Sequence, residues 1–239
     1  MGFEQTGNGQ FQKLASHLAN TREESQKLIK AIVSHDYEKV RKMIFQGFHV
    51  NGDGCGYGSP ISCAVRQGEE PRACDIVRQL IEADPSILTN RTPHRMTPLH
   101  EVCSSKNGLH IAKILLRAGA DVHAVDIYHK TPLHYCLENA TFRWDLSSDR
   151  EQNDQIELIK MLIQEGADVD EVDIRGNSPR SIALRGLIGK GNVVYEDSVH
   201  CDQKIKDIML FIHEKHYFDH LPWLTSDGTP PGLNDPNSI

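Results

Sequence analysis

The sequence predicts an all-α solenoid, a stack of helix–turn–helix units, from three observations. The tetrapeptide Thr-Pro-Leu-His begins at Thr97 and again at Thr131. An aliphatic run follows each time, and Gly-Ala-Asp-Val then begins at Gly119 and at Gly166. Self-similarity at a spacing of about 33 residues is typical of a repeat array, in which each unit buries its apolar face against its neighbours.

Each part of the repeated pattern has a physical reason. Threonine can cap the free amides at a helix start, and proline fits the first helical turn, where no donor is needed. Leu99, Val102 and Cys103 then follow helical spacing. A second helix is expected from about Leu109 to Ala118, and Gly119 supplies the left-handed conformation in which helices commonly end.

Taken together, these blocks resemble the ankyrin-repeat family. The resemblance implies an array over residues 22–220 with about five units and protruding turns. We expect the units near 22–56, 57–94, 95–128, 129–174 and 175–217, the outer two being degenerate caps. A loose segment is expected at 1–21 and a flexible tail, rich in proline, glycine and aspartate, at 221–239.

Composition argues against several classes of partner. The net charge of −7 disfavours nucleic acid, whose binding needs a dense basic face. No apolar run approaches the roughly 18 residues that cross a bilayer, so no membrane contact is expected. The 6 cysteines include no Cys-x-x-Cys pair, which favours a reducing, cytoplasmic location without disulfides. The pattern contains no phosphate loop, metal-ligand cluster or catalytic set, so we expect no cofactor and no metal.

Two pairs of polar residues recur with the motif. The resemblance implies that His100 and His134 form hydrogen bonds within and between adjacent turns, instead of binding a metal or acting as a base. Asp126 and Asp173 are expected to stabilise the turns in which they lie.

The fourth unit departs from the pattern. Thr97 and Val122 are 25 positions apart, whereas Thr131 and Val169 are 38 apart, which places an insertion of 13 residues near 139–154. The insertion includes Phe142, Arg143 and Trp144, and tryptophan and arginine are enriched in interface hot spots. Partner binding by this loop is one interpretation; burial of its tryptophan against its own helices is the other.

The turns supply a second group of candidate partner-binding residues. Ankyrin turns project along one edge and, with the first helices, line the concave binding face. The candidates are Arg91, Arg95, Ile127, Tyr128, His129, Ile174 and Arg175. The alternative is that these side chains pack sideways on neighbouring turns. Separately, Asn51 resembles the asparagine that ankyrin turns offer to asparaginyl hydroxylase.

The resemblance implies a non-enzymatic protein-interaction module, an adaptor, inhibitor or targeting subunit, that is monomeric by itself. One alternative is a bacterial or viral effector that binds a host protein in the host cytoplasm through the same surface. A remote alternative is an enzyme with a site built from the insertions. Its available groups would be Asp145, Asp149, Glu151, His200 and Cys201. The partner is not identified by the sequence, since fold alone does not name one.

Overall fold

The computed structural model describes residues 21–52, 58–68, 71–105, 108–142, 149–188, 207–208 and 210–211. Within these residues the secondary structure is entirely helical, which confirms the predicted all-α class. No helix in this part of the chain is long and apolar enough to cross a membrane.

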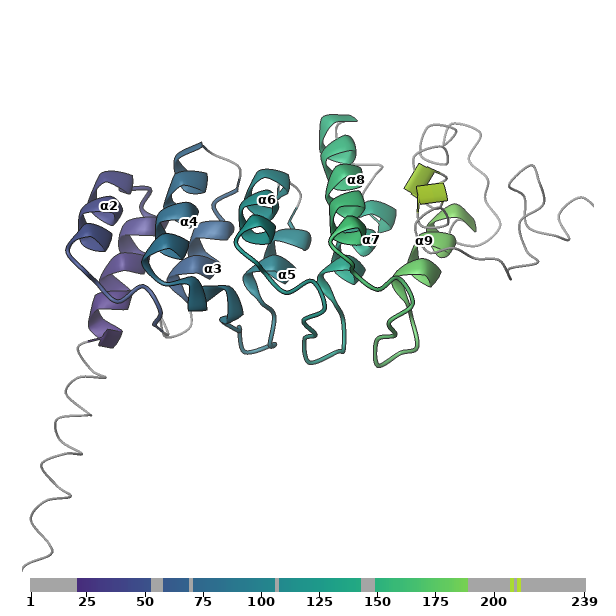
Figure 1. The fold of residues 1–239 in the computed structure, drawn as a ribbon, viewed down its shortest axis with the longest axis horizontal. Helices are drawn as coiled ribbons and strands as arrows, with labels where there is room; N and C mark the ends of the chain where they lie inside the picture. The colour runs from purple at the N-terminus through teal and green to yellow at the C-terminus, as the bar shows by residue number, and fades with distance from the viewer. Residues whose placement is uncertain are drawn as a thin grey trace, which may run out of the picture.

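The helices stand in two rows (Figure 1). One row contains α2 (Tyr37–Phe45), α4 (Pro71–Ala83), α6 (Leu109–Arg117) and α8 (Asp149–Gln164). The other contains α3 (Pro60–Val65), α5 (Pro98–Cys103), α7 (Pro132–Phe142) and α9 (Pro179–Ile188). Successive helices contact each other within each row. A further helix over 21–33, a short 3₁₀ helix η1 (Pro85–Thr89) and helical residues at 207–208 and 210–211 are also present.

The helix ends follow the sequence signals. Ser59, before the first proline of α3, accepts a hydrogen bond from the Ser62 amide at 3.3 Å. Past the C-terminal ends of α6 and α8, Gly119 and Gly166 have φ values of +90° and +93°. This left-handed conformation suits glycine, which has no Cβ to clash with the backbone. The predicted left-handed glycine after the second helix is therefore confirmed at Gly119.

A continuous apolar core runs along the stack between the two rows. Its fully buried large side chains include Leu28, Ile61, Leu80, Leu99, Ile111, Leu133, Leu137 and Leu158. Burying each such side chain contributes about 1.5–3 kcal/mol. Cys63, Cys74, Cys103 and Cys136 are buried free thiols that fill the core as small apolar groups.

The insertion expected as a loop at 139–154 is partly helical. Helix α7 continues to Phe142 and α8 begins at Asp149, so both ends of the insertion extend helices. Asn139 of α7 anchors the extension, because its Nδ2 donates to the Cys103 carbonyl at 2.8 Å. Residues 143–148 lie outside the described part, and the array limits at 22 and 220, the unit boundaries and the two tails stay predictions.

Candidate functional site

Three turns project side by side from one edge of the stack (Figure 1). They are residues 92–97, 126–131 and 173–178, which we call the turn edge. The first amide of each turn donates to the carbonyl four residues on, over 3.0, 3.1 and 2.9 Å. Hydrogen bonds from Ile127 N to His94 O, at 3.1 Å, and from Ile174 N to Tyr128 O, at 3.0 Å, join neighbouring turns. The backbone thus connects the three turns into one continuous surface.

Two buried aspartates hold the second and third turns in shape. Asp126 Oδ1 accepts from the amides of Tyr128, at 2.7 Å, and Lys130, at 2.9 Å. Asp173 Oδ1 likewise accepts from the amides two and four residues on, at 2.9 and 2.8 Å. Partial burial by itself would raise the pKa of Asp173. The hydrogen bonds from Asn177 act in the opposite direction and outweigh it, and the resulting pKa is lower than usual. The predicted role of the two aspartates is confirmed.

Buried histidines tie the same two turns to the helices behind them. His100 Nδ1 accepts from the Thr97 amide at 3.1 Å, so Nε2 carries the proton and donates to the Lys130 carbonyl at 3.0 Å. His134 repeats the arrangement, with 3.1 Å from the Thr131 amide and 3.1 Å to the Asn177 carbonyl. Burial lowers the pKa of both histidines, which favours the neutral form. Their predicted structural role is confirmed.

The tip of each turn contains one residue with positive φ. In the third turn this residue is Gly176, at φ +75°. In the first and second turns the equivalent residues are Arg95, at φ 60°, and His129, at φ 55°. A residue with a Cβ costs about 1–2 kcal/mol in this left-handed conformation. Two cationic or titratable side chains therefore occupy backbone positions that glycine would fill without strain.

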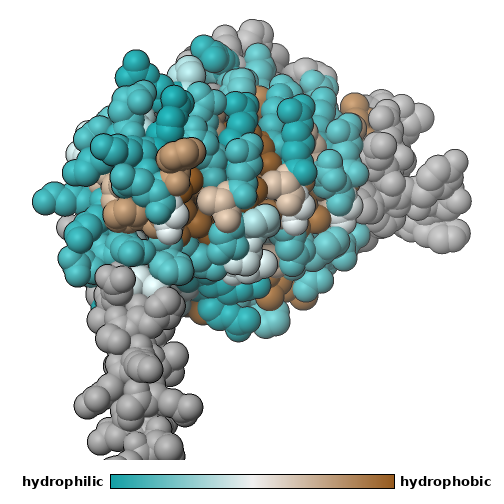
Figure 2. All heavy atoms as spheres, turned by 60° about the vertical axis from the view of Figure 1, so that its left-hand side comes forward, coloured by the Kyte–Doolittle hydropathy of each residue, from teal (hydrophilic) through white to brown (hydrophobic). Residues whose placement is uncertain are grey.

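The side chains at the tips are exposed and of two kinds. Ile127, Tyr128 and Ile174 have exposed fractions of 41%, 42% and 61%. Arg95, Arg175 and the histidines His94 and His129 are exposed beside them. Figure 2 shows hydrophobic residues across the middle of the face in view and also at its lower edge, the side on which the turns project in Figure 1. The neighbouring turns pair through their backbones, and these side chains remain available for contact.

Arg91, just before the first turn, has a structural contact that the sequence did not indicate. Its Nη1 donates to the carbonyls of Arg95, at 3.0 Å, and Val125, at 2.8 Å. The exposed guanidinium therefore bridges two turns. Its predicted contact with a partner stays a prediction.

The other predicted site residues are Phe142, Arg143, Trp144 and Asn51. Helix α7 ends at Phe142, whose side chain lies outside the described residues, as do Arg143 and Trp144. Asn51 is exposed and its Nδ2 donates to Ser86 Oγ at 2.8 Å; its hydroxylation is untested.

The groups of the remote enzyme hypothesis are not assembled by the described residues. Asp145, His200 and Cys201 fall outside them, as does the side chain of Asp149, whereas Glu151 lies in α8. No three His, Cys, Asp or Glu side chains gather in a metal-binding arrangement anywhere in the described part.

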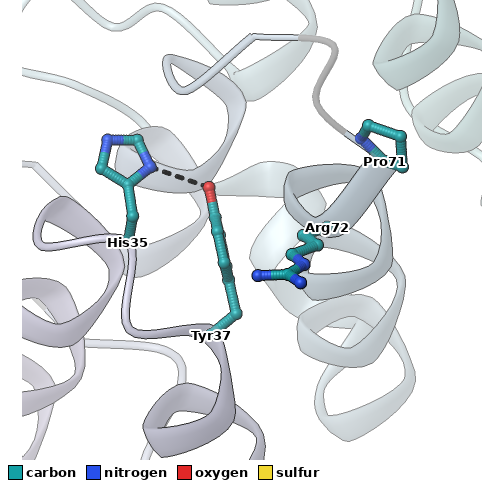
Figure 3. Close-up of a pocket in the computed structure, with 4 residues that line it drawn as sticks. All are labelled: His35, Tyr37, Pro71 and Arg72. Atoms are coloured by element: carbon teal, nitrogen blue, oxygen red, sulfur yellow. Dashed lines mark hydrogen bonds between the residues drawn. The ribbon is translucent and has the colours of Figure 1, made fainter.

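A recess of about 670 Å³ lies between the start of α2 and the start of α4 (Figure 3). His35, Tyr37, Pro71 and Arg72 line it, and His35 Nδ1 is 2.8 Å from the Tyr37 hydroxyl. The polar groups among these four lining residues are the hydrogen-bonded His35 and Tyr37 and the guanidinium of Arg72.

One buried carboxylate lies at the α3–α5 contact. The Glu101 side chain is 9% exposed, its Oε2 has no hydrogen-bond partner, and its Oε1 lies 3.9 Å from Arg66 Nη1. Burial raises the pKa of Glu101. No signal in the sequence indicated this burial.

Comparison with known proteins agrees with the geometry. Residues 61–173 match the family model for ankyrin repeats (3 copies). A stretch of 57 residues is 44% identical to serine/threonine-protein kinase VIK of Arabidopsis thaliana. It spans 24% of this chain and only 13% of the kinase, so it assigns no kinase activity here. Such stacked repeats generally act as non-enzymatic protein-interaction modules. Residues 61–173 of the chain therefore consist of ankyrin repeats, within an all-α stack of helices.

Proposed function

We propose that the chain is a non-enzymatic adaptor, inhibitor or targeting subunit whose turn edge holds a partner protein. The observation that carries this proposal is the exposure of Ile127, Tyr128 and Ile174 on turns whose backbones are hydrogen-bonded to one another. Exposed aliphatic and aromatic side chains on a fixed frame are what a protein interface uses as anchors.

Rigidity supports the same proposal. Each of the second and third turns is held by an aspartate, a histidine and its neighbours' backbone. A surface that is ordered before binding loses little conformational entropy when the partner arrives, so more of the contact free energy appears as affinity. The left-handed Arg95 and His129 fit this view, because backbone strain persists and clusters at binding surfaces.

The insertion belongs to the proposal as a second contact. Phe142 is the last residue of α7, the helix that provides His134, and Arg143 and Trp144 come next in the sequence. A tryptophan and an arginine there would extend the interface beyond the turns. We further propose that the chain is a monomer and that it lies in the cytoplasm. The location is supported by the four buried cysteines, which are free thiols of the kind that persist in reducing compartments.

The experiment is affinity capture from eukaryotic lysate, quantified by mass spectrometry, with three variants of the full chain. Ile127→Ser/Tyr128→Ser/Ile174→Ser removes the apolar anchors of the turn edge. Phe45→Ser, on α2, removes a side chain that is 92% exposed but lies outside the turns, and is the matched control. Arg143→Ala/Trp144→Ala tests the insertion.

A partner captured by the wild type and by Phe45→Ser, but reduced at least about tenfold by the turn variant, is the expected result. Loss in the insertion variant as well would place both segments in the interface. Equal capture by the turn variant, with its helix content unchanged by circular dichroism, would contradict the proposal.

A further inference from the structure

We infer that the partner presents an acidic segment with aliphatic or aromatic anchors to the turn edge. This inference rests on the proposed function and specifies its partner class. Two features carry it: the sign of the exposed charges on the three turns, and the way in which apolar and cationic side chains alternate there.

Every exposed charged side chain within the three turns is a potential cation. Arg95 and Arg175 are exposed, and His94 and His129 stand beside them. The carboxylates of the turns belong to Asp126 and Asp173, which are buried with exposed fractions of 1% and 4% and accept hydrogen bonds from backbone amides. Folding therefore removes the negative charges of the turns from the surface.

This positive surface belongs to an otherwise acidic protein, whose net charge is −7. Of the two acids before the third turn, Asp170 is held by Arg180 over 2.6 and 2.8 Å, while Glu171 is exposed. Charges are screened beyond about 8 Å at physiological ionic strength, so the local sign at the turns decides which segments approach. An acidic segment is attracted to the exposed cationic side chains of the turns, and this attraction favours one position and orientation of the segment.

The apolar side chains define the rest of the partner's chemistry. Ile127 and Ile174 occupy equivalent positions, directly after the aspartates of adjacent turns, and Tyr128 and Arg175 follow them. A partner that places aliphatic or aromatic groups between its carboxylates would meet both kinds of side chain. A nucleic acid is a poorer match, since isoleucines offer nothing to phosphates and two arginines are few for a polyanion.

The two side chains at positive φ, Arg95 and His129, also support contact with a partner at the turn edge. Gly176 shows that glycine fits the tip of this turn, yet the first two turns have Arg95 and His129 there, at positive φ. The energetic penalty of about 1–2 kcal/mol at each position is understandable if these side chains contact a partner.

The test selects a displayed library of random peptides of about 12 residues, which span about 40 Å when extended. Selection uses the full wild-type chain, and enriched peptides are then titrated against variants. Arg95→Glu/Arg175→Glu reverses the charge of the turn edge, whereas Arg41→Glu/Arg72→Glu makes the same change on exposed residues of α2 and α4. Ile127→Ser/Ile174→Ser removes apolar anchors and keeps the charge.

We expect enriched peptides with net negative charge and several large apolar residues. Their affinity should fall at least about tenfold in Arg95→Glu/Arg175→Glu, and less than about twofold in the control. Affinity should also weaken as salt is raised. Exchange of the acidic residues for lysine should restore binding to the charge-reversed variant.

Three results would overturn the inference, and they differ in whether the proposed function fails with it. Neutral or basic peptides that depend on Ile127 and Ile174 would contradict the acidic partner but leave the turn edge as a binding surface. Peptides with no dependence on any turn variant would contradict the proposed function as well. A single-stranded RNA of about 20 nucleotides that displaces the peptides with similar affinity would make nucleic acid the better occupant.

Discussion

The contacts that α5 and α7 make with the following turns differ from those at α3. His100 on α5 and His134 on α7 each donate to a carbonyl of the following turn. On α3 the equivalent residue is Ser62, whose hydroxyl is 3.2 Å from that of Ser59. The buried carboxylate of Glu101, with one oxygen unpartnered, lies at the contact of α3 with α5.

This difference matters because stability in a repeat array depends on each nearest-neighbour contact. The two turns held by histidines, 126–131 and 173–178, are the turns with exposed isoleucines. Residues 92–97 receive no such tie from Ser62. We therefore expect the array to be most resistant to local opening at α5–α9 and least resistant near α3.

The largest expected change in stability follows from removing a histidine that is hydrogen-bonded to the following turn. His134→Ala should lower the free energy of unfolding by about 3 kcal/mol, because it leaves the buried Thr131 amide unpartnered and removes the bond to Asn177. Ser62→Ala, at the equivalent position of α3, should lose about 1 kcal/mol or less. Urea unfolding of both variants measures the difference. Equal losses would show that the histidines do not distinguish the two regions.

The next largest expected change is a gain in stability, at Glu101. Glu101→Leu should raise the free energy of unfolding by about 1–2 kcal/mol, because it replaces a buried carboxylate with one unpartnered oxygen by an apolar side chain. The matched change on α7 is Tyr135→Leu, which should destabilise, since the Tyr135 hydroxyl donates to Asp126 at 2.7 Å. Thermal unfolding compares the two; destabilisation by Glu101→Leu would mean that Ser62 and Arg66 compensate the buried charge.

The pH dependence of the α3–α5 contact should differ from that of the histidine ties. The folded pKa of Glu101 lies above its usual 4.5, so the folded state binds the proton more tightly and ionisation destabilises the fold as pH rises through the folded pKa. Glu101→Gln should therefore exceed the wild type in stability at pH 7.5, and this advantage should shrink as pH falls toward 4.5. Urea titrations at several pH values test this; a constant advantage would contradict it.

The buried histidines should make stability depend on pH with the opposite sign, so that stability falls as the pH falls. Their folded pKa values lie below the usual 6.5, so the unfolded state binds protons more tightly once pH falls below about 6.5. The Glu101→Gln chain, in which that carboxylate no longer titrates, should lose stability between pH 7.5 and 5.5. Unchanged stability over this interval would show that His100 and His134 are not held neutral.

The smallest expected effect concerns the tips of the turns. Arg95→Gly and His129→Gly should each raise the free energy of unfolding by about 1 kcal/mol by relieving the positive φ, while weakening partner binding. Gly176→Ala is the control, and should destabilise by a similar amount, since nothing lies within 4 Å of its added Cβ and only the backbone is strained. Tighter partner binding by the glycine variants would argue against a contact role for these side chains.

Much of the fold could be predicted because the signals are local. The starts of α5 and α7 at the proline of the motif, the stop at Gly119 and the roles of Asp126 and His100 all depend on residues a few positions apart within a repeated motif. The structure contains these features because the same short-range contacts form in each repeat.

The remaining features depend on contacts between distant residues. The burial of Glu101 requires knowledge of how α3 packs on α5, and the bridge from Arg91 to Val125 spans 34 positions. The helical extension of α7 depends on the Asn139 bond to Cys103 in the preceding unit. The strain at Arg95 and His129 could have been found, since alignment with Gly176 marks that position as the glycine position of the turn.

The central claim is that the partner lies on the turn edge. Its most direct test replaces Tyr128, and as a control Phe45, by a photoreactive benzophenone amino acid and irradiates the full chain in eukaryotic lysate. We predict a discrete crosslinked protein from position 128 and none from position 45. A crosslink from position 45 without one from position 128 would place the partner elsewhere and contradict it.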